Sequence, residues 1–268
     1  MATESADCAV LGIDAAWTAA NPSGVALVVR RGGRARVERL ASSFSAFVEN
    51  PQRSALVGRT ASLDDVIRTA RRDTDVPLAC VAMDVPLSRR AIRGRRAADR
   101  AISRAFGAMK CAAHSPNPNR PGAWGRALQR AAETAGYTLQ CAGDPPGLPR
   151  AKALIEVYPH PALLRLCSMK ERLPYKSKFP EALRRRSITR IWNALVTEMD
   201  GVPVDLVVPP ESATGREWKA CEDALDALVC AWVGLEFLAQ RAIPYGDSTA
   251  AVWVPSASRE TATPSQQP

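Results

Sequence analysis

Three short apolar runs in this chain each carry an acidic residue at the point where a strand would end. The acids are Asp14, Asp84 and Glu156. Short runs rich in Val, Ile and Leu are typical of buried strands in an α/β sheet. A buried carboxylate is costly unless it has a partner, and ligands of open α/β sheets bind beyond the carboxyl ends of the strands. We therefore expect the three acids to form a site for a divalent metal ion at one sheet edge.

A further group of acids, Glu222, Asp223 and Asp226, stands just before the apolar stretch 227–238. At about 100° per residue, these side chains span an arc of about 100° on a helix. Two interpretations of the Glu222–Asp223 pair are open. The pair belongs to the metal site, or it stabilises a helix N-terminus, whose partial positive charge favours carboxylates. Asp226 lies among apolar residues, so its carboxylate needs a partner.

Composition favours one large α/β domain. The chain has 268 residues, of which 46% are hydrophobic, enough for a substantial core. We expect the domain to cover residues 8–255, with an insertion at about 88–147, and residues 1–7 and 256–268 to be disordered tails. No apolar run has the length of a membrane span, and the polar start does not resemble a signal peptide.

The numbers of cysteines and histidines argue against disulfide bonds and against a zinc site. The seven cysteines are scattered and include no CxxC pair, which predicts reduced thiols in a cytoplasmic protein. With only two histidines in the chain, we do not expect a zinc site built from histidine.

The net charge of +9 is concentrated in two blocks. Residues 89–110 carry eight basic side chains against one acid, and residues 165–190 carry nine against two, so each block has a charge of +7. Beside a carboxylate site, such blocks favour a polyanionic substrate, here nucleic acid; a proteome rich in arginine is the alternative explanation. The candidate substrate contacts are Arg93, Arg95, Arg96, Arg100, His160, Lys176 and Lys178. A histidine with a structural hydrogen bond and solvated lysines are the alternatives for the last three.

The pattern along the chain predicts strands over about 8–16, 25–30, 34–40, 78–85 and 151–158, and an edge strand over 250–254. Gly32 and Gly33 indicate a hairpin between the second and third strands. Ser62 and Asp65 resemble a capping box, which starts a helix ending near Arg72. Further helices are expected over 89–106 (as one basic helix or two short ones), 124–135 with Gly136 as cap, from about 159, over 179–199 and over 218–240.

Five motifs in this order resemble the domain of unknown function 429 family of predicted RNase H-like nucleases. They are Gly12–Trp17, Met83–Leu87, Arg96–Arg100, Glu156–Pro161 and Asp223–Ala231. The spacing of Asp223 and Asp226 is also similar to the closing acidic helix of RuvC-type Holliday-junction resolvases. The resemblance covers about residues 10–255. It implies an RNase H-like mixed sheet with flanking helices and a helical insertion between strands four and five. In such a sheet, strand one lies between the hairpin and strand four, and strand five lies beyond strand four.

The resemblance implies hydrolysis of phosphodiester bonds with Mg²⁺ or Mn²⁺. Two ions about 4 Å apart activate a water and stabilise the leaving oxygen, and magnesium prefers carboxylate oxygen. By this match Asp14 bridges both ions, Asp84 binds one, and Asp223 with Asp226 binds the other.

Glu156 is the fifth catalytic candidate, in a supporting role. Two strand spacings would separate it from Asp14 by about 9–10 Å. It would reach only the metal on the Asp84 side, or act structurally by accepting hydrogen bonds from backbone amides of the turn or by pairing with an arginine of the insertion.

Two other classes of protein fit parts of the pattern. In a nucleic-acid-binding protein without catalysis, the acids would pair with arginines, as Asp84 with Arg89 and Asp99 with Arg100. An actin-like or sugar-kinase-like phosphotransferase shares the fold but needs a phosphate loop of Gly and Thr after its first aspartate. Here Asp14 is followed by Ala, Ala and Trp17, and no P-loop occurs in the chain. Trp17 itself either stacks on a base or packs in the core.

Overall fold

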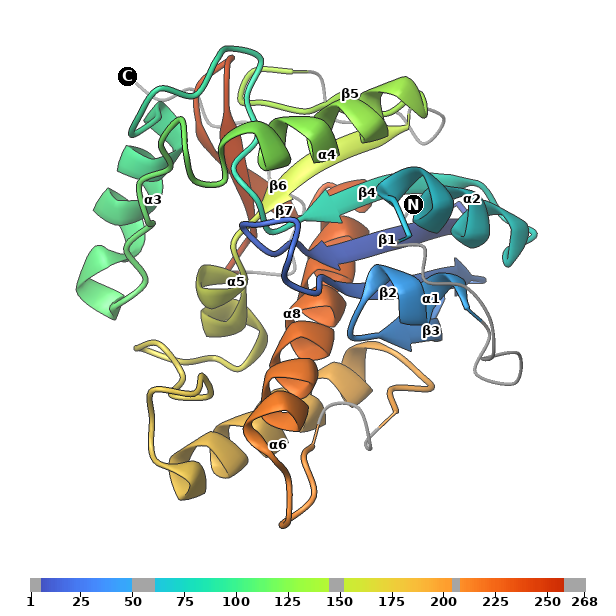
Figure 1. The fold of residues 1–268 in the computed structure, drawn as a ribbon, viewed down its shortest axis with the longest axis vertical. Helices are drawn as coiled ribbons and strands as arrows, with labels where there is room; N and C mark the ends of the chain where they lie inside the picture. Colours follow the sequence, from blue (N-terminus) through green and yellow to red (C-terminus); the bar gives the residue numbers. More distant parts are fainter. Residues whose placement is uncertain (1–5, 50–60, 145–151, 204–207, 258–268) are drawn as a thin grey trace.

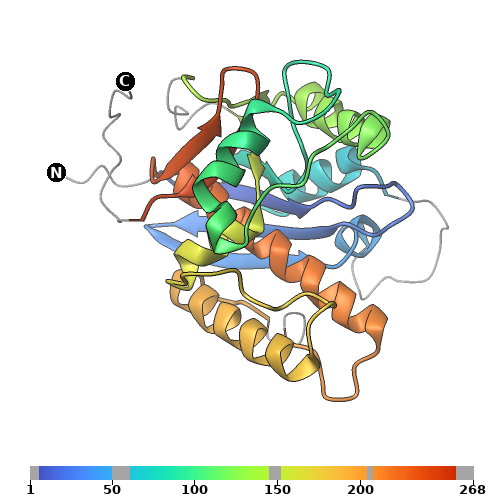
Figure 2. The ribbon, with the colours of Figure 1, turned by 90° about the vertical axis from the view of Figure 1, so that its left-hand side faces the viewer.

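The computed structural model of the protein describes residues 6–49, 61–144, 152–203 and 208–257. One mixed sheet forms its centre, and helices pack on both faces, as the two perpendicular views show (Figures 1 and 2). The expected tails lie outside the described residues except for 6–7 and 256–257, and so does the end of the expected insertion at 145–147.

The first half of the sheet has the predicted order. β1 (Cys8–Asp14), β2 (Gly24–Arg31) and β3 (Arg34–Ala41) form an antiparallel meander. β4 (Leu78–Met83) pairs in parallel with β1, and β6 (Ala153–Val157) pairs in parallel with β4. β1 therefore lies between the hairpin and β4, with β6 beyond β4. Every residue of β4 and β6 is buried, which explains why parallel strands appear as continuous apolar runs.

The other half of the sheet differs from the prediction. β8 (Ala251–Pro255) was expected at an edge, but it lies between β6 and an additional strand, β7 (Ala242–Gly246). β7 was not predicted because it contains Pro244, and proline is depleted in strands and tolerated mainly in edge strands. A short strand, β5 (Thr138–Leu139), pairs with the start of β6.

The helices include every predicted one, two of them with shifted starts, and one short helix at 44–48 that was not predicted. They are α1 (Phe44–Val48), α2 (Leu63–Arg72), α3 (Ala97–Phe106) with the 3-10 turn η2 (Gly107–Met109), α4 (Gly122–Thr134), α5 (Pro159–Leu166), α6 (Glu181–Glu198) and α8 (Gly215–Leu238). α2 opens with the predicted capping box of Ser62 and Asp65. α3, η2, α4 and β5 form the predicted insertion between β4 and β6. Within the described residues, no helix combines the length and apolar character needed to cross a membrane.

The basic segment before α3 is irregular, although it was expected to be helical. α3 begins only after Arg96, which serves as its N-cap in an extended conformation. The Asp99 carboxylate closes this start by accepting a hydrogen bond from the Arg96 backbone N–H at 2.7 Å. A capping interaction thus ends the irregular segment at position 96.

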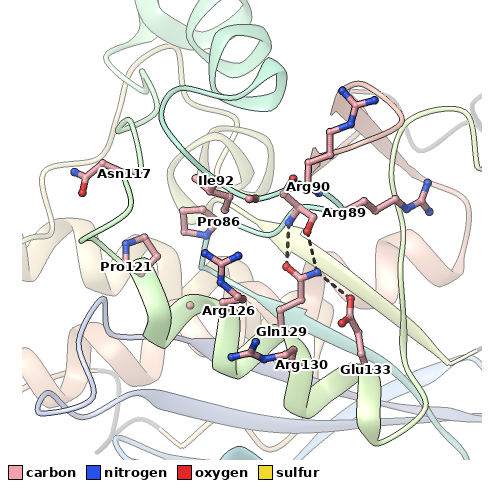
Figure 3. A pocket seen from close by; sticks show the side chains of 14 residues that line it. Pro86, Arg89, Arg90, Ile92, Asn117, Pro121, Arg126, Gln129, Arg130 and Glu133 are labelled. Carbon is pink, nitrogen blue, oxygen red and sulfur yellow. Dashed lines mark hydrogen bonds between the residues drawn. The ribbon is translucent and has the colours of Figure 1, made fainter.

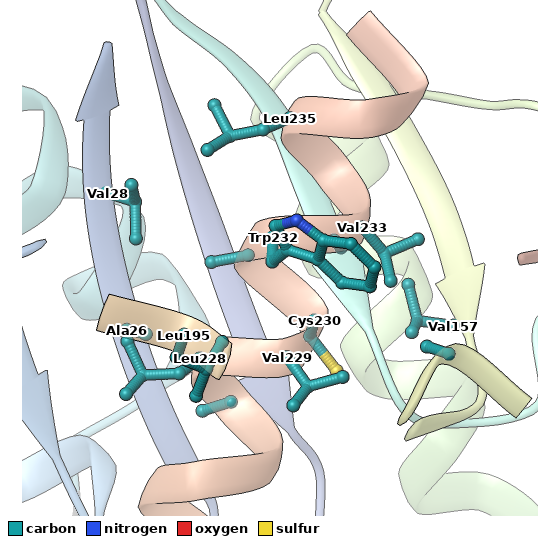
Figure 4. Packing of buried hydrophobic residues seen from close by; sticks show 14 of the residues in the cluster. Ala26, Val28, Val157, Leu195, Leu228, Val229, Cys230, Trp232, Val233 and Leu235 are labelled. Carbon is teal, nitrogen blue, oxygen red and sulfur yellow. The ribbon is translucent and has the colours of Figure 1, made fainter. Parts of the chain in front are cut away.

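α8 packs directly on the sheet because two strand positions lack side chains. A Cβ atom at Gly12 of β1 would lie 2.1 Å from the Ala227 carbonyl oxygen, and one at Gly24 of β2 would lie 2.0 Å from that of Asp223. The apolar face of α8, with Leu228 and Trp232, fills the core between the sheet and α6 (Figure 4). The backbone contact fixes where the acids of α8 stand relative to β1 and β2.

Gly12→Ala is expected to lower the free energy of unfolding by about 3 kcal/mol, at the upper end of overpacking costs, because the new methyl group meets helix backbone and not a movable side chain. Urea denaturation measures this change. Gly107→Ala is the matched control, since Gly107 has φ −61° and ψ −43° and no neighbour within 4 Å of an added Cβ. Equal stability of the two variants would show that α8 does not touch β1 closely.

Candidate active site

Asp14 and Asp84 lie side by side at the same edge of the sheet. They follow neighbouring parallel strands in register, because Ile13 pairs with Met83 and the Asp84 backbone N–H donates to the Ile13 carbonyl at 2.8 Å. Both side chains are half-buried. The structure thus brings the first two predicted metal ligands together.

α8 adds two more carboxylates at this place. Asp14 pairs across the sheet with Gly24, and Gly24 touches the backbone of Asp223. Asp223 and Asp226 are 1% and 2% exposed. Burial raises the pKa of Asp14 well above its usual range, and the nearby charges of Asp226, Asp84 and Asp223 act in the same direction. Four of the five predicted acids therefore form one interacting group, which we call the carboxylate cluster: Asp14, Asp84, Asp223 and Asp226.

The acids of α8 do not cap the helix. α8 begins at Gly215, three residues earlier than predicted, and its first turn is closed by a capping box of Thr214 and Glu217. Glu222 and Asp223 lie about two turns further along. The helix-capping interpretation of this pair is therefore wrong.

Glu222 forms an ion pair of its own, while the charges of Lys176 and Asp226 also act on it. Its Oε1 accepts a hydrogen bond at 3.1 Å from Nη2 of Arg184 on α6. The Arg184 guanidinium in turn stacks 3.7 Å from the centre of the Trp218 ring. This buried contact joins α6 to α8.

Two lysines and a tyrosine bind the carboxylates of α8. The Tyr175 hydroxyl donates to Asp226 Oδ1 at 2.7 Å, and the Lys176 ammonium group binds Oδ2. Lys219, one turn before Asp223, binds its Oδ1. Burial opposes the charge of Lys176, but Asp226 and Asp14 outweigh it and raise its pKa, so the lysine stays protonated. Lys176 is therefore ion-paired, so the solvated interpretation is wrong, while its contact with phosphate stays a prediction.

His160 lies beneath the cluster and not at the surface. It is 8% exposed, its ring packs edge-on against Tyr158 and Tyr175, and its Nδ1 lies 3.4 Å from the Tyr175 hydroxyl. Burial lowers its pKa well below 6.5, and the positive charges of nearby Arg172 and Lys176 lower it further. This placement fits the structural interpretation of His160, and contact with a phosphate is not supported.

Glu156 is bound in a separate ion-pair network. Arg96 donates to both of its oxygens, each at 2.6 Å, and the Leu87 backbone N–H donates to Oε2 at 2.7 Å. Arg96 also binds Asp99 at 2.6 Å. Both structural contacts considered for Glu156, to a turn amide and to an arginine of the insertion, are present. The Arg96 side chain is only 8% exposed, so the prediction that it contacts nucleic acid is wrong.

The other predicted substrate contacts are exposed: Arg93, Arg95, Arg100 and Lys178. The pairings expected of a protein without catalysis do not form. Arg89 binds Asp144 at 2.5 Å, and Asp99 binds Arg96 and not Arg100. Within the described residues, no hydrogen bond or ion pair reaches the Asp84 carboxylate.

The cluster fits a divalent cation by charge and by donor type. Four carboxylates and the ammonium groups of Lys176 and Lys219 leave a formal charge of −2 when all are ionised. Burial and then Asp226 raise the pKa of Asp84 to about 8, and Asp223 Oδ2 is buried without a hydrogen-bond donor. Oxygen ligands alone suit Mg²⁺ or Mn²⁺.

The side chains of the cluster do not form a complete set of metal ligands in this structure. In the part of the chain that the structure describes, no three His, Cys, Asp or Glu side chains are placed to hold an ion together. Lys176 and Lys219 engage two of the four carboxylates. Lys219 is 59% exposed along its side chain, so solvent can replace it at Asp223.

Three residues near the cluster were not predicted from the sequence: Lys219, Tyr175 and His114. Lys219 has a local signal, because a lysine four residues before an aspartate pairs with it on a helix. Tyr175 has none, since its contact with Asp226 depends on the tertiary fold. His114 lines a hollow of about 40 Å³ beside Asp84, together with Trp17. Trp17 is half-buried there, with the Arg120 guanidinium 5.6 Å from its ring centre.

Comparison with known proteins gives a family and no activity. The model of a family described as "Protein of unknown function (DUF429)" matches residues 12–250. No curated protein and no solved structure matches the chain. The matched range contains all four residues of the carboxylate cluster.

Proposed function

Because this chain belongs to the DUF429 family, whose description assigns no activity, we propose a function from the site: hydrolysis of phosphodiester bonds in nucleic acid, dependent on a divalent metal ion. One observation carries the proposal. Asp14, Asp84, Asp223 and Asp226 meet at the carboxyl edge of the sheet, and only Asp223 and Asp226 are paired with a lysine. Burial and the neighbouring carboxylates raise the pKa values of Asp14 and Asp84, as expected for acids that lack a compensating cation. The RNase H-like order of the first strands and the basic surface give further support.

A bound Mg²⁺ or Mn²⁺ supplies charge stabilisation to a phosphoryl group and lowers the pKa of a water. Asp14 and Asp84 would hold the ion, because no cation of the described residues forms an ion pair with either, together with Oδ2 of Asp223. Tyr175 and Lys176 orient Asp226 through contacts with its two oxygens. The Lys176 ammonium also places a fixed positive charge beside the cluster, where it favours an approaching phosphate.

Glu156 and Arg96 act on the site from a distance. They bind the Leu87 backbone at both its N–H and its carbonyl oxygen. Leu87 lies three residues after Asp84, so this network holds the chain that leaves the cluster. Arg96 is a positioning residue in this proposal and makes no contact with substrate.

One observation favours a second function, the binding of nucleic acid without catalysis. The lysine pairs of Asp223 and Asp226 neutralise half of the cluster, and no metal-binding trio is formed among the described residues. In that case the acids would serve only to place Lys176 and Lys219 against phosphate.

The two functions are separated by calorimetry and a cleavage assay on the same preparation. We expect Mg²⁺ or Mn²⁺ to bind the wild-type protein, and labelled DNA or RNA strands to be cleaved with the ion and to stay intact with EDTA. Binding of nucleic acid with neither heat of cation binding nor cleavage would establish the second function and contradict the first.

A further inference from the structure

A pocket of about 200 Å³ lies between the loop after β4 and helix α4 (Figure 3). We call it the arginine pocket and define it by six of its lining residues: Pro86, Arg90, Pro121, Arg126, Gln129 and Arg130. Its loop wall leaves the sheet directly after Asp84. The pocket is part of the insertion and belongs to neither the carboxylate cluster nor the Glu156 network.

Hydrogen bonds hold the two walls of the pocket together. Gln129 of α4 accepts from the Ser88 backbone N–H and donates to the Ser88 carbonyl, both at 3.0 Å. Gly125 lets the helix approach closely, since a Cβ atom there would lie 2.7 Å from Pro121 and 3.4 Å from Val85. The shape of the pocket is therefore set before any ligand arrives.

The pocket carries an excess of positive charge. Four arginines and one glutamate line it, and Arg89 is neutralised by Asp144 at 2.5 Å. Within the described residues, the side chains of Arg90, Arg126 and Arg130 make no hydrogen bond or ion pair. Figure 3 shows Arg126 directed between Pro86 and Gln129, into the space between the walls. Guanidinium groups in such a position bind phosphate oxygens, often with two hydrogen bonds.

The arginine pocket adjoins the carboxylate cluster. Pro86 lines both this pocket and the small hollow that contains Asp84 and Trp17. A strand that passes Asp84 can therefore extend to the arginines beyond Pro86.

We propose that the arginine pocket binds a backbone phosphate of the same nucleic acid strand whose phosphodiester bond lies at the carboxylate cluster. This inference rests on the proposed function and adds the direction in which the substrate runs, from Asp84 over Pro86 to α4. Contacts to phosphate position a strand and carry no sequence information, so the pocket sets register and not sequence preference.

The test is binding of labelled 12-nucleotide DNA and RNA strands, followed by fluorescence anisotropy in EDTA at several salt concentrations. The double variant Arg126→Ala/Arg130→Ala is expected to bind about tenfold more weakly, and the slope of log affinity against log salt should fall by about 1.4 for two lost contacts. The matched control is Arg36→Ala/Arg216→Ala, which removes two exposed arginines of β3 and α8 that lie outside both basic blocks. It should bind as the wild type does.

Each other outcome has a defined meaning. Equal losses in both double variants would show diffuse attraction and overturn the proposal. If inorganic phosphate displaces the strand at micromolar concentration, the pocket is a site for a small anion, and the proposal is also wrong. Because EDTA removes catalysis from the measurement, a protein that binds through these arginines but never cleaves would contradict the proposed function and leave the pocket in place.

Discussion

Asp14→Asn is expected to reduce cation-dependent cleavage to the background rate while the chain stays folded. Asp14 lies on the central strand and interacts with all three other carboxylates of the cluster. An amide of the same size keeps the packing but removes the negative charge on which cation binding depends. Calorimetry should show weaker Mg²⁺ or Mn²⁺ binding in parallel with the loss of cleavage. Unchanged cleavage by this variant would remove Asp14 from the site.

The same variant is expected to be more stable than the wild type in EDTA, by about 1 kcal/mol or about 2 °C for a chain of this size. The pKa of Asp14 is raised in the folded state, so its protonation stabilises the fold below the usual pKa of 3.8, and this contribution is lost as the pH rises through the folded-state pKa. The advantage of the asparagine should therefore be larger at pH 9 than at pH 5. Asp64→Asn, at an exposed position of α2, should show no such difference. If the variant were less stable than the wild type at both pH values, repulsion between neighbouring carboxylates would not destabilise the wild-type fold, and this prediction would be wrong.

Arg96→Ala is expected to cost about 3–5 kcal/mol of stability, because it leaves two buried carboxylates without their cation. Glu156 and Asp99 are 4% and 2% exposed, so bulk water does not solvate their charges. Urea denaturation measures the loss. Arg93→Ala, three residues away at an exposed position, is the control and should stay within about 0.5 kcal/mol of the wild type.

Two further variants keep this prediction testable if Arg96→Ala does not fold. Arg96→Lys retains the positive charge but cannot make the bidentate contact with Glu156. The loss of stability should therefore be smaller than for Arg96→Ala. Glu156→Gln should reduce cleavage moderately, since the neutral side chain holds Arg96 less firmly. Weaker nucleic acid binding by Arg96→Lys at full stability would restore Arg96 as a substrate contact.

The sequence predicts the part of the site that depends on strands. β1 and β4 are buried on both faces, and their apolar runs therefore mark Asp14 and Asp84 as the residues at their ends. The start of α8 is harder to find because its capping box, Thr214 and Glu217, lies in a polar segment before the apolar stretch. The acids consequently look like helix caps until the preceding turns are seen.

The other site residues were predicted wrongly or not at all because their contacts join segments that are distant in the sequence. A block of basic residues does not reveal which side chain turns inward. Arg95 and Arg96 stand four and three residues before Asp99, so the spacing does not show which of them pairs with it. Lys176 and Tyr175 meet Asp226 because the segment between α5 and α6 folds back on α8. No periodicity or spacing encodes that contact.

The close approach of Gly24 to Asp223 has a consequence for biosynthesis. The two residues are 199 positions apart in the sequence, so the cluster joins β1 and β2 to a helix that is made long after them. Pairing of segments so distant in sequence carries a large entropic cost and occurs late in folding. A nascent chain that stops before α8 holds Asp14 and Asp84 alone. The protein therefore cannot assemble its cluster before α8 has been made, and the proposed nuclease would stay inert on its ribosome until then.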